Sequence, residues 1–335
     1  MVSPTSRVIR VDEPGKVSVL KQVTIPRPTP TSTQVLVKVA YAGLNYMDIA
    51  QRLGYFPTSF PFIPGREGSG QIIEVGSEVR YDFKVGDRVV FMAPSTYAEH
   101  VAVDVVHLAK LPNHISYEQG AALVAQGLTA WSLVSRAYPI QKNDWVVIHA
   151  AAGGVGLILS QLARSLGAHA IGVVSSQDKA ALARANGAEH VVVIPHNSSY
   201  EALEQKVQEL TNGEGVHAVF DSIGKDTFDS SLNITRLAGT LVLFGSASGS
   251  IPDFNVMRLM PKNLKLTWVS LYNYVKTFEE FNVLLSEWLA LLEGEDAIKL
   301  GVSKVYEFED IQQAHLDFES RKSTGKLLLK VAGDI

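Results

Sequence analysis

A glycine-rich turn near the middle of the chain has the residue types and spacing that point most directly to chemistry. Ala151, Gly153 and Gly156 occupy the three positions of a G-x-G-x-x-G pattern, with Ala in place of the first Gly. Small residues let a backbone approach a pyrophosphate, and the N–H groups at a helix start attract its charge. The turn therefore predicts a dinucleotide site, and an ordinary glycine-rich turn is the alternative. The residues expected around the phosphates are Ala152, Gly153, Gly154 and Val155.

The end of the second predicted strand of this region indicates which nicotinamide cofactor binds. NAD sites carry an acid there for the ribose 2′-hydroxyl. This chain instead has Ser175 and Ser176, with Lys179 close behind, so a 2′-phosphate would meet hydroxyls and a cation. Asp178 is expected in the first turn of the next helix, where it favours the helix dipole. The sequence predicts NADPH, and the alternative is that these side chains are solvated surface.

The segments that must position these residues alternate between apolar runs and helical patterns from Trp145 onward. This alternation is typical of βαβ units and a doubly wound parallel sheet, and Gly167 and Gly187 are predicted helix stops. The predicted strands are Trp145–Ala150, Ala170–Val174, His190–Ile194, His217–Asp221, Thr240–Gly245 and Leu264–Val269. The predicted helices are Val155–Leu166, Asp178–Asn186, Tyr200–Leu210, Asp226–Leu237 and Phe278–Leu292.

The first part of the chain differs, because short β-like runs separated by Pro and Gly turns predict a barrel-like all-β module. Ser116 and Gln119 are spaced to cap a helix. The tail does not continue the βα alternation, so it is expected to return to the first domain. We predict a catalytic domain over residues 1–127, completed by 300–335, and a cofactor domain over 128–299.

Composition excludes several classes of protein. The chain has 335 residues, a formal charge of -4 and no Cys, so thiolate ligands, disulfides and a Cys nucleophile are impossible. No basic cluster favours nucleic acid, and no run of about 18 apolar residues predicts a membrane helix. The N-terminus lacks a signal-like apolar segment, so a cytoplasmic location is expected. No metal site is expected either. His100, His107 and His114 recur every seven residues, but the turn-forming Pro112 and Asn113 prevent them from sharing one helix face.

A set of short motifs, in order and spacing, resembles the quinone oxidoreductases of the zeta-crystallin type, a zinc-independent branch of the medium-chain dehydrogenases/reductases. The resemblance runs from Val35 to Lys330. The motifs are Leu44-Asn45-Tyr46-Met47-Asp48, Pro64-Gly65-Arg66-Glu67-Gly68-Ser69-Gly70, Val85-Gly86-Asp87-Arg88-Val89, the glycine-rich turn, Asp221-Ser222-Ile223-Gly224 and Phe244-Gly245-Ser246-Ala247-Ser248-Gly249.

The resemblance implies a GroES-like catalytic domain, a Rossmann cofactor domain and a homodimer joined through the cofactor domains. Zinc-dependent relatives carry Gly-His-Glu where this chain has Gly65-Arg66-Glu67. Arg66 cannot ligate zinc. Glu67 is expected to be the structural partner of a nearby cation, with a catalytic role as the alternative.

Residue roles carried over from this family are expectations for matching positions. Asn45 and Tyr46 are expected to be catalytic, and Tyr46, Tyr55 and Phe56 to contact the substrate. Lys179 and Arg321 are expected to hold the 2′-phosphate, and His196 stands near where bacterial members place a Tyr. The other expected cofactor contacts are Asn45, Gln126, Thr129, Ser222, Phe244, Gly245 and Ser246. Ordinary structural roles, such as a barrel wall for Tyr46 and a solvated helix end for Arg321, are the alternatives.

The activity expected from these features is NADPH-dependent reduction of quinones, ortho-quinones in particular. The Tyr46 hydroxyl and the Asn45 amide would meet the acceptor oxygen as it gains charge. An alkenal or enone double-bond reductase is the alternative enzyme. A lens crystallin-like or AU-rich RNA-binding protein is the non-enzymatic alternative, against which the negative net charge counts.

Overall fold

The chain folds into two units, each assembled from separate segments of sequence. The computed structural model describes residues 3–251, 253–333 and 335. The first unit comprises residues up to Ala125, Val275–Ser286 and the segment from Leu300 onward, and the second comprises Gln126–Tyr274 and Glu287–Lys299. Two helices, α2 (Tyr117–Ser132) and α7 (Phe278–Ala290), contribute residues to both units.

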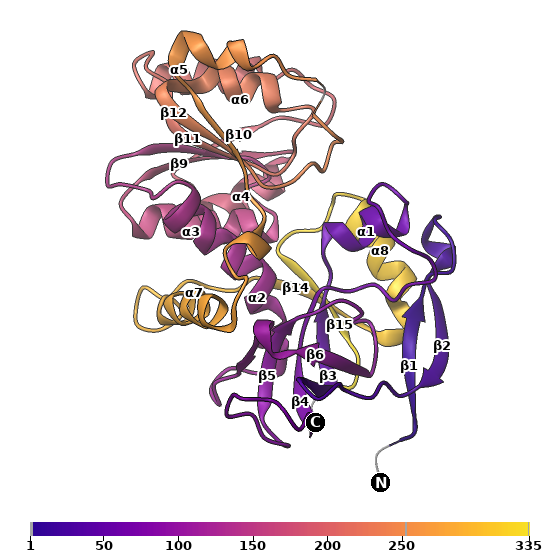
Figure 1. The fold of residues 1–335 in the computed structure, drawn as a ribbon. Coiled ribbons are helices and arrows are strands. Elements are labelled where there is room, and N and C mark those ends of the chain that lie inside the picture. The colour runs from indigo at the N-terminus through magenta and orange to yellow at the C-terminus, as the bar shows by residue number, and fades with distance from the viewer. Residues whose placement is uncertain (1–2, 252, 334) are drawn as a thin grey trace. The chain divides into compact units, whose positions relative to one another are not determined.

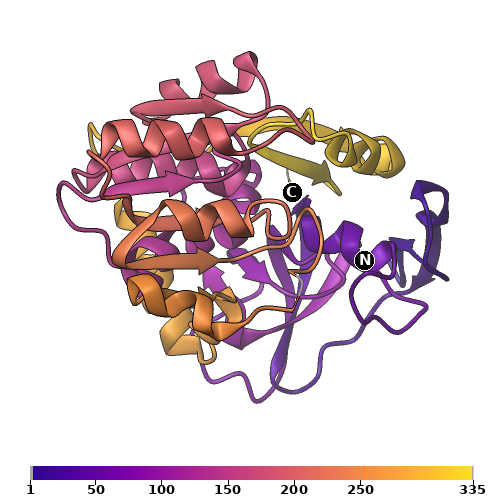
Figure 2. The ribbon, with the colours of Figure 1, turned by 90° about the horizontal axis from the view of Figure 1, so that it is seen from above.

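The second unit is built on a six-stranded parallel sheet with the strand order β10-β9-β8-β11-β12-β13. Helices α3 and α4 cover one face and α5 and α6 the other (Figure 1), and Figure 2 shows helices running alongside the strands. The strands are β8 (Trp145–Ile148), β9 (His169–Val174), β10 (His190–Val193), β11 (Val216–Asp221), β12 (Thr235–Leu243) and β13 (Lys265–Trp268). The helices are α3 (Gly154–Ser165), α4 (Gln177–Ala185), α5 (Glu201–Leu210) and α6 (Phe228–Ile234).

The strand order reverses between the neighbours β8 and β11, and ligands bind at such switch points in open α/β sheets. Val147, Ile171 and Val219, on the central strands, are fully buried. A parallel sheet covered on both faces needs such continuous apolar runs, and these made the strands recognisable in the sequence. The predicted alternation of strands and helices is confirmed. Gly167 and Gly187 follow the ends of α3 and α4 with φ of +76° and +99°, as expected of helix stops.

One predicted helix is too long. The helix predicted over Asp226–Leu237 is α6, which covers only Phe228–Ile234. Thr235 already pairs with Val216 of β11, so the chain becomes extended three residues earlier than the helical pattern suggested. The β-branched side chain of Thr235 suits a strand, and backbone pairing outweighs the helical spacing of Leu237.

The first unit is built on a mostly antiparallel seven-stranded sheet. Its order is β14-β15-β3-β4-β5-β7, and β6 pairs with β3. These strands are β3 (Gln34–Gly43), β4 (Glu67–Val75), β5 (Arg88–Met92), β6 (His100–Asp104), β7 (Leu108–Lys110), β14 (Val302–Glu307) and β15 (Lys326–Lys330). A separate antiparallel pair is formed by β1 (Thr5–Arg10) and β2 (Lys21–Pro26). The predicted fold class, a barrel-like β domain plus a doubly wound parallel sheet, is confirmed.

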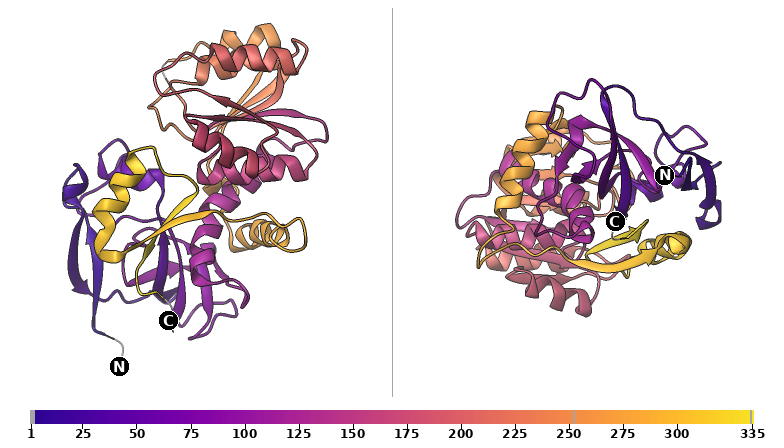
Figure 3. Two further views of the ribbon diagram at one scale, coloured as in Figure 1. Left: turned by 180° about the vertical axis from the view of Figure 1, so that it is seen from behind. Right: turned by 90° about the horizontal axis from the view of Figure 1, so that it is seen from below.

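The return of the tail to the first unit is confirmed by strand pairing. β15 runs antiparallel to β3, with Leu329 opposite Ala42. The preceding helix α8 (Ile311–Glu319) lies beside α1 (Tyr46–Arg52) in Figures 1 and 3. An ion pair of 2.5 Å between Arg52 and Glu319 joins these two helices.

The predicted cap of α2 is present. The Ser116 N–H donates to the Gln119 side chain at 3.0 Å, and the Gln119 N–H donates to the Ser116 hydroxyl at 3.1 Å. These reciprocal bonds satisfy two donors at the helix start. No helix in the described ranges is long and apolar enough to cross a membrane.

Candidate functional site

The glycine-rich turn leaves the end of β8 and starts α3. Ala150 adopts a left-handed conformation with φ of +51°, and its carbonyl accepts the Gly153 N–H at 2.8 Å. Gly153 is the N-cap of α3, a helix of 12 residues. The N–H groups in the first turn of a helix have no acceptor within the helix, so this turn directs donors and a positive dipole end at one place. This arrangement is the geometry that a pyrophosphate requires.

Other atoms come very close to two glycines of this turn, backbone atoms at Gly156 and a flexible side chain at Gly154. A Cβ added to Gly156 would lie 2.3 Å from the Ala150 carbonyl oxygen, so no side chain fits where α3 approaches the strand end. A Cβ added to Gly154 would lie 2.1 Å from the Gln126 side chain. The Gln126 amide therefore packs directly on the turn.

Several other predicted cofactor residues follow the carboxyl ends of neighbouring strands. Ser175 and Ser176 follow β9, Ser222 follows β11, and Phe244 follows β12. Because all these strands are parallel, their carboxyl ends meet at one edge of the sheet. The structure thus brings these residues to the edge that carries the glycine-rich turn. Thr129 lies on α2 in the same unit, where its carbonyl accepts the Ser132 hydroxyl.

The two turns after β11 and β12 are packed against each other. A Cβ on Gly245 would lie 2.8 Å from the Ser222 carbonyl oxygen. Backbone bonds tie the turns together, since the Ala247 N–H donates to the Ser222 carbonyl at 3.1 Å. Ser222, Gly245 and Ser246 therefore form one small, backbone-rich surface.

Asp221 holds this surface in place, a role that was not predicted from the sequence. One carboxylate oxygen accepts the N–H groups of Ile223 and Gly224, at 2.8 and 3.1 Å. The other accepts the hydroxyls of Thr227 and Ser231, at 2.7 and 2.9 Å. Asp221 is completely buried, so these four donors compensate its charge and fix the turn that carries Ser222.

Lys179 lies in the first turn of α4, where a cation is disfavoured by the helix dipole. Burial lowers the pKa of its ammonium group. Ser176 caps the same helix, with its hydroxyl accepting the Lys179 N–H at 3.4 Å. Asp178 occupies the first turn as expected. A lysine kept at an unfavourable, half-buried helix start fits a site for an anion such as a 2′-phosphate.

The other two residues predicted around the 2′-phosphate lie on different elements. His196 is exposed in the loop after β10, and the Ile194 N–H at the start of that loop donates to the Val174 carbonyl of β9. Arg321 lies in the first unit, directly after the C-cap of α8, with φ of +57°. Glycine is the usual residue in that conformation, so the backbone is strained at Arg321.

The centre of the first unit contains a buried ion pair between Glu67 and Lys326. The ammonium group lies 2.5 Å from Glu67 Oε1, and the side chains are 0% and 1% exposed. Lys326 also donates to the Leu44 carbonyl at 2.9 Å and to Asn45 Oδ1 at 3.1 Å, so all three of its donors are used. Glu67 Oε2 accepts the Ala125 N–H at 2.7 Å. The expectation that Glu67 pairs with a nearby cation is confirmed.

The Asn45 side chain is fully engaged by this pair. Its amide donates to Glu67 Oε1 at 2.9 Å and to the Gly43 carbonyl at 3.3 Å. Lysine can only donate, which fixes Oδ1 toward Lys326 and Nδ2 toward Glu67. Both amide hydrogens are therefore occupied in this structure, which favours a positioning role for Asn45 over donation to an acceptor.

Asp48 extends the network on the other side of Asn45. Its carboxylate accepts the Asn45 N–H at 2.8 Å, the Tyr97 hydroxyl at 2.9 Å and the Gly65 N–H at 3.3 Å. Asp48 and Tyr97 are both 0% exposed. Burial raises the pKa of Asp48 to about 6 and raises the pKa of Tyr97 well above its usual value. We name the set Asn45, Asp48, Glu67, Tyr97 and Lys326 the buried polar network.

The predicted substrate residues lie at the surface of this unit, beside the network. Tyr46 is the first residue of α1 and is 45% exposed, while Tyr55 and Phe56 follow α1 and are 79% and 42% exposed. Partial burial raises the pKa of the Tyr46 hydroxyl, and the positive charge of Arg321 opposes that rise. The Tyr46 phenol therefore keeps its proton at neutral pH and can donate a hydrogen bond.

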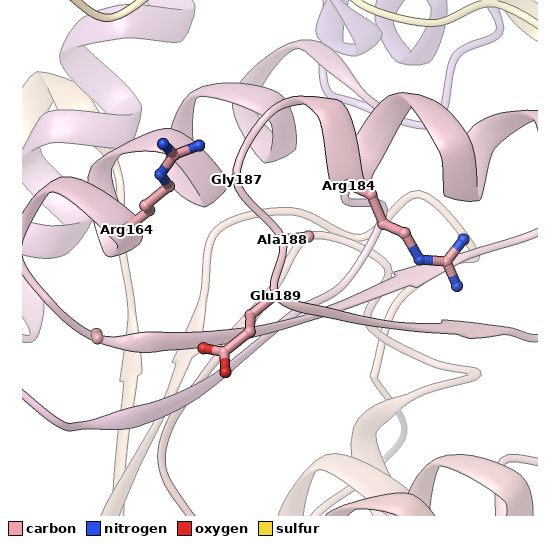
Figure 4. Close-up of a pocket in the computed structure, with 6 residues that line it drawn as sticks. Arg164, Arg184, Gly187, Ala188 and Glu189 are labelled. Carbon is pink, nitrogen blue, oxygen red and sulfur yellow. The ribbon is translucent and has the colours of Figure 1, made fainter. Parts of the chain in front are cut away.

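The described residues contain a pocket outside the predicted site but no candidate metal cluster. Within the described ranges, no group of three or more His, Asp or Glu side chains could hold a metal ion. A pocket of about 310 Å³ lies at the ends of α3 and α4, away from the glycine-rich turn (Figure 4). In Figure 4 the Arg184 side chain extends away from Arg164, and the Glu189 carboxylate lies below both.

Lys326 was not predicted from the sequence, because it lies in a tail strand far along the chain from its partner. The separation between Glu67 and Lys326 is 259 residues. The only available signal was a lysine at the start of an otherwise apolar strand. Arg52 and His315, both fully buried, were missed for the same reason.

Comparisons with known proteins agree with this arrangement. Residues 31–113 match the alcohol dehydrogenase GroES-like domain family, and residues 154–288 match the zinc-binding dehydrogenase family. A probable quinone oxidoreductase of Schizosaccharomyces pombe is 39% identical over 330 residues, which are 98% of each chain. A 2-haloacrylate reductase of Burkholderia is 32% identical over 321 residues, covering 90% of this chain and 92% of that one.

A solved structure extends the likeness to three dimensions. The quinone oxidoreductase of Escherichia coli, complexed with NADPH, superposes with a TM-score of 0.91 at 35% sequence identity. The match covers 97% of this chain and 99% of that chain. Both units of the present structure therefore have counterparts in that protein.

Proposed function

This chain belongs to the quinone oxidoreductase family of the medium-chain dehydrogenases/reductases, and we propose that it is an NADPH-dependent quinone reductase that prefers ortho-quinones. The proposal rests mainly on the residues at the carboxyl ends of the parallel strands. There the glycine-rich turn accepts no side chain at Gly156, and a half-buried Lys179 follows a strand end without an acid. The ortho-quinone preference rests on the family resemblance alone.

The residues of this chain supply position and hydrogen bonds for the reaction. NADPH, when bound, supplies a hydride. The glycine-rich turn and Lys179 would hold its phosphates, and Ser222 and Gly245 would line the ribose or nicotinamide. The Tyr46 hydroxyl would donate to the acceptor oxygen as negative charge develops there. The buried polar network would hold α1, and with it Tyr46, in one orientation.

Initial rates with 9,10-phenanthrenequinone and with each reduced nicotinamide cofactor test this proposal. We expect quinone-dependent oxidation of NADPH, with kcat/KM for NADPH at least about tenfold above that for NADH, since a charge-assisted contact contributes about 1.5–3 kcal/mol. No quinone-dependent oxidation of either cofactor would refute the activity. Equal values for the two cofactors would refute the role of Lys179.

A second candidate is reduction of an activated carbon–carbon double bond. The observation that favours it is the identity with a 2-haloacrylate reductase, whose named substrate carries such a bond. The same hydride and the same Tyr46 donor would serve a conjugated carbonyl. Turnover of a 2-alkenal with NADPH, measured beside phenanthrenequinone, separates the two: a higher kcat/KM for the alkenal would make this the main activity.

We further propose that two copies of the chain associate through the second unit. β13 is an edge strand of the parallel sheet. Its last residue, Trp268, and three apolar side chains of the preceding segment are each more than half exposed: Val256, Met257 and Met260. An open strand edge with exposed apolar groups favours pairing with an identical edge. Light scattering should give twice the chain mass and a Trp268→Lys variant the single mass, whereas a monomeric native protein would refute the dimer.

We also propose that the protein is cytoplasmic. Cell fractionation would check this location. Recovery of the protein in a membrane or secreted fraction would contradict it.

A further inference from the structure

Hydrogen bonds and buried neighbours hold the backbone of Arg66 in place. This residue stands where the zinc-dependent relatives carry the His of their Gly-His-Glu motif. Its carbonyl accepts the Ala93 N–H at 3.1 Å. The neighbouring Gly65, with φ of +97°, donates its N–H to buried Asp48, and the other neighbour is buried Glu67. The backbone on both sides of Arg66 is therefore tied to the buried polar network.

The Arg66 guanidinium has hydrogen-bonding capacity that the protein does not use. Nε donates to Gln51 Oε1 at 3.3 Å. Among the residues that the structure describes, the two terminal nitrogens have no acceptor, and no carboxylate lies within ion-pair distance. The side chain is nevertheless partly buried. A guanidinium has five donors in a planar fork, so four of them remain for a ligand.

The nearby carboxylates are already committed to other donors. Glu67 accepts from Lys326, Asn45 and the Ala125 N–H. Asp48 accepts from three donors and is completely buried. Neither can turn toward Arg66 without leaving a buried donor unsatisfied, which costs about 1–3 kcal/mol.

The Arg66 guanidinium contacts the helix whose two ends carry the residues proposed to contact the substrate. Gln51, its partner, is on α1, the helix that begins with Tyr46. The same Gln51 side chain donates to the Thr58 hydroxyl at 3.3 Å. Backbone bonds from Tyr55 and Phe56 to the Ala50 carbonyl, at 2.9 and 3.3 Å, return the loop to α1. Arg66 is thus bonded to the helix that joins Tyr46 to Tyr55 and Phe56.

We propose that Arg66 forms an anion subsite of the acceptor site, so that the enzyme selects aromatic acceptors bearing a carboxylate or sulfonate group. This inference rests on the proposed function. The aromatic side chains would contact the ring, and the terminal nitrogens of Arg66 would bind the anionic oxygens in a bidentate manner. Arginine suits this role better than lysine because its fork matches the two oxygens.

A binding experiment tests the subsite without any turnover. Dissociation constants of 2-naphthoate and of the near-isosteric neutral 2-naphthamide are measured by calorimetry with saturating NADP+. We expect the native protein to bind naphthoate at least about tenfold more tightly than naphthamide, which is about 1.4 kcal/mol. Arg66→Gln should reduce this ratio to about one, and Arg66→Lys should retain part of it.

The matched control is Arg80→Gln, which removes an exposed guanidinium from the same unit and should leave the ratio unchanged. Circular dichroism and thermal unfolding show whether each variant is folded. An equal ratio in the native protein and Arg66→Gln would overturn the proposal. A weakened affinity for NADPH with an unchanged ratio would also overturn it, because Arg66 would then serve the cofactor.

A turnover experiment separates this proposal from the proposed function. It compares 1,2-naphthoquinone with its 4-sulfonate, using NADPH and the same variants. We expect kcat/KM to favour the sulfonate about tenfold, mainly through KM, and Arg66→Gln to abolish that preference while still reducing the neutral quinone. Turnover without a preference for the sulfonate would overturn the subsite. Selective naphthoate binding without quinone turnover would support the subsite and refute the proposed function.

Discussion

The glycine-rich turn and the buried polar network achieve precise positioning by opposite means. The turn comes from one continuous segment, and it acts through backbone groups and through the absence of side chains at Gly154 and Gly156. The network joins side chains up to 281 residues apart, and it acts through charge and hydrogen bonds. The turn should therefore be sensitive to added volume, whereas the network should be sensitive to lost charge.

The largest effect is expected when the network loses its cation. Lys326→Met should destabilise the protein by about 3–5 kcal/mol, because Glu67 would remain as an uncompensated buried charge. Urea unfolding measures the change. The control is Lys330→Met on the same strand, which breaks an exposed pair with Glu307 and should cost less than about 1 kcal/mol. Similar losses in both variants would mean that burial of the pair is unimportant.

Added volume should weaken cofactor binding strongly at the turn. Gly156→Ala should weaken NADPH binding about a hundredfold, or about 2.7 kcal/mol, because the Cβ would lie 2.3 Å from a carbonyl oxygen. In Gly153→Ala the nearest atom would be 3.2 Å away, so a smaller loss is expected. Calorimetric titration of NADPH gives both values. Equal affinities in the two variants would show that the close approach at Gly156 has no functional role.

The pH dependence of stability should distinguish two buried groups of the first unit. Burial lowers the pKa of His315 to about 3, so below pH 6.5 the unfolded chain takes up a proton that the folded protein does not, and stability falls as pH falls. Asp48 acts oppositely. Its raised pKa of about 6 makes stability fall as pH rises from about 4 to about 6.

Replacing His315 should expose the contribution of Asp48. Between pH 4 and pH 6 the two slopes oppose each other in the native protein. In His315→Gln, stability should therefore fall with rising pH relative to the native curve, by about 1 kcal/mol per pH unit. Urea unfolding at several pH values gives the slopes. Parallel curves for the two proteins would show that His315 is not the group responsible.

A charge in the cofactor region should matter for only one cofactor. Lys179→Gln should weaken NADPH binding about tenfold, or about 1.4 kcal/mol, and leave NADH binding unchanged, because only NADPH carries the 2′-phosphate. Fluorescence titration with each cofactor measures the affinities. Lys142→Gln, an exposed change in the same unit, is the control. Equal weakening for both cofactors would place Lys179 at the pyrophosphate instead.

The smallest effect is expected at Tyr46, which lies at the surface beside the network. Tyr46→Phe should lower kcat for phenanthrenequinone only a few-fold, because a quinone accepts a hydride with little help from a hydrogen-bond donor. Steady-state rates with saturating NADPH give the value. A loss above about a thousandfold would instead show that Tyr46 is an obligatory proton donor.

The sequence predicted the second unit better than the first for a physical reason. Parallel strands covered on both faces must be continuous apolar runs, so β8 and β9 and the helix stops at Gly167 and Gly187 could be recognised locally. The helix predicted over Asp226–Leu237 failed because pairing of Thr235 with Val216 is a long-range interaction. In the first unit, local pattern identified short strands but not which distant strand would pair with β3.

By itself the sequence determined the parts of this protein that depend on neighbouring residues: the glycine-rich turn, the cap of α2, the uncharged end of β9 and the absence of Cys. Only the tertiary structure decided that β15 would bring Lys326 to Glu67, that the pair would occupy the Asn45 amide, and that Arg66 would keep four donors unused. The contact of Lys326 with Glu67 joins segments more than 250 residues apart. No local spacing rule governs such contacts, because they are set by how whole strands pair.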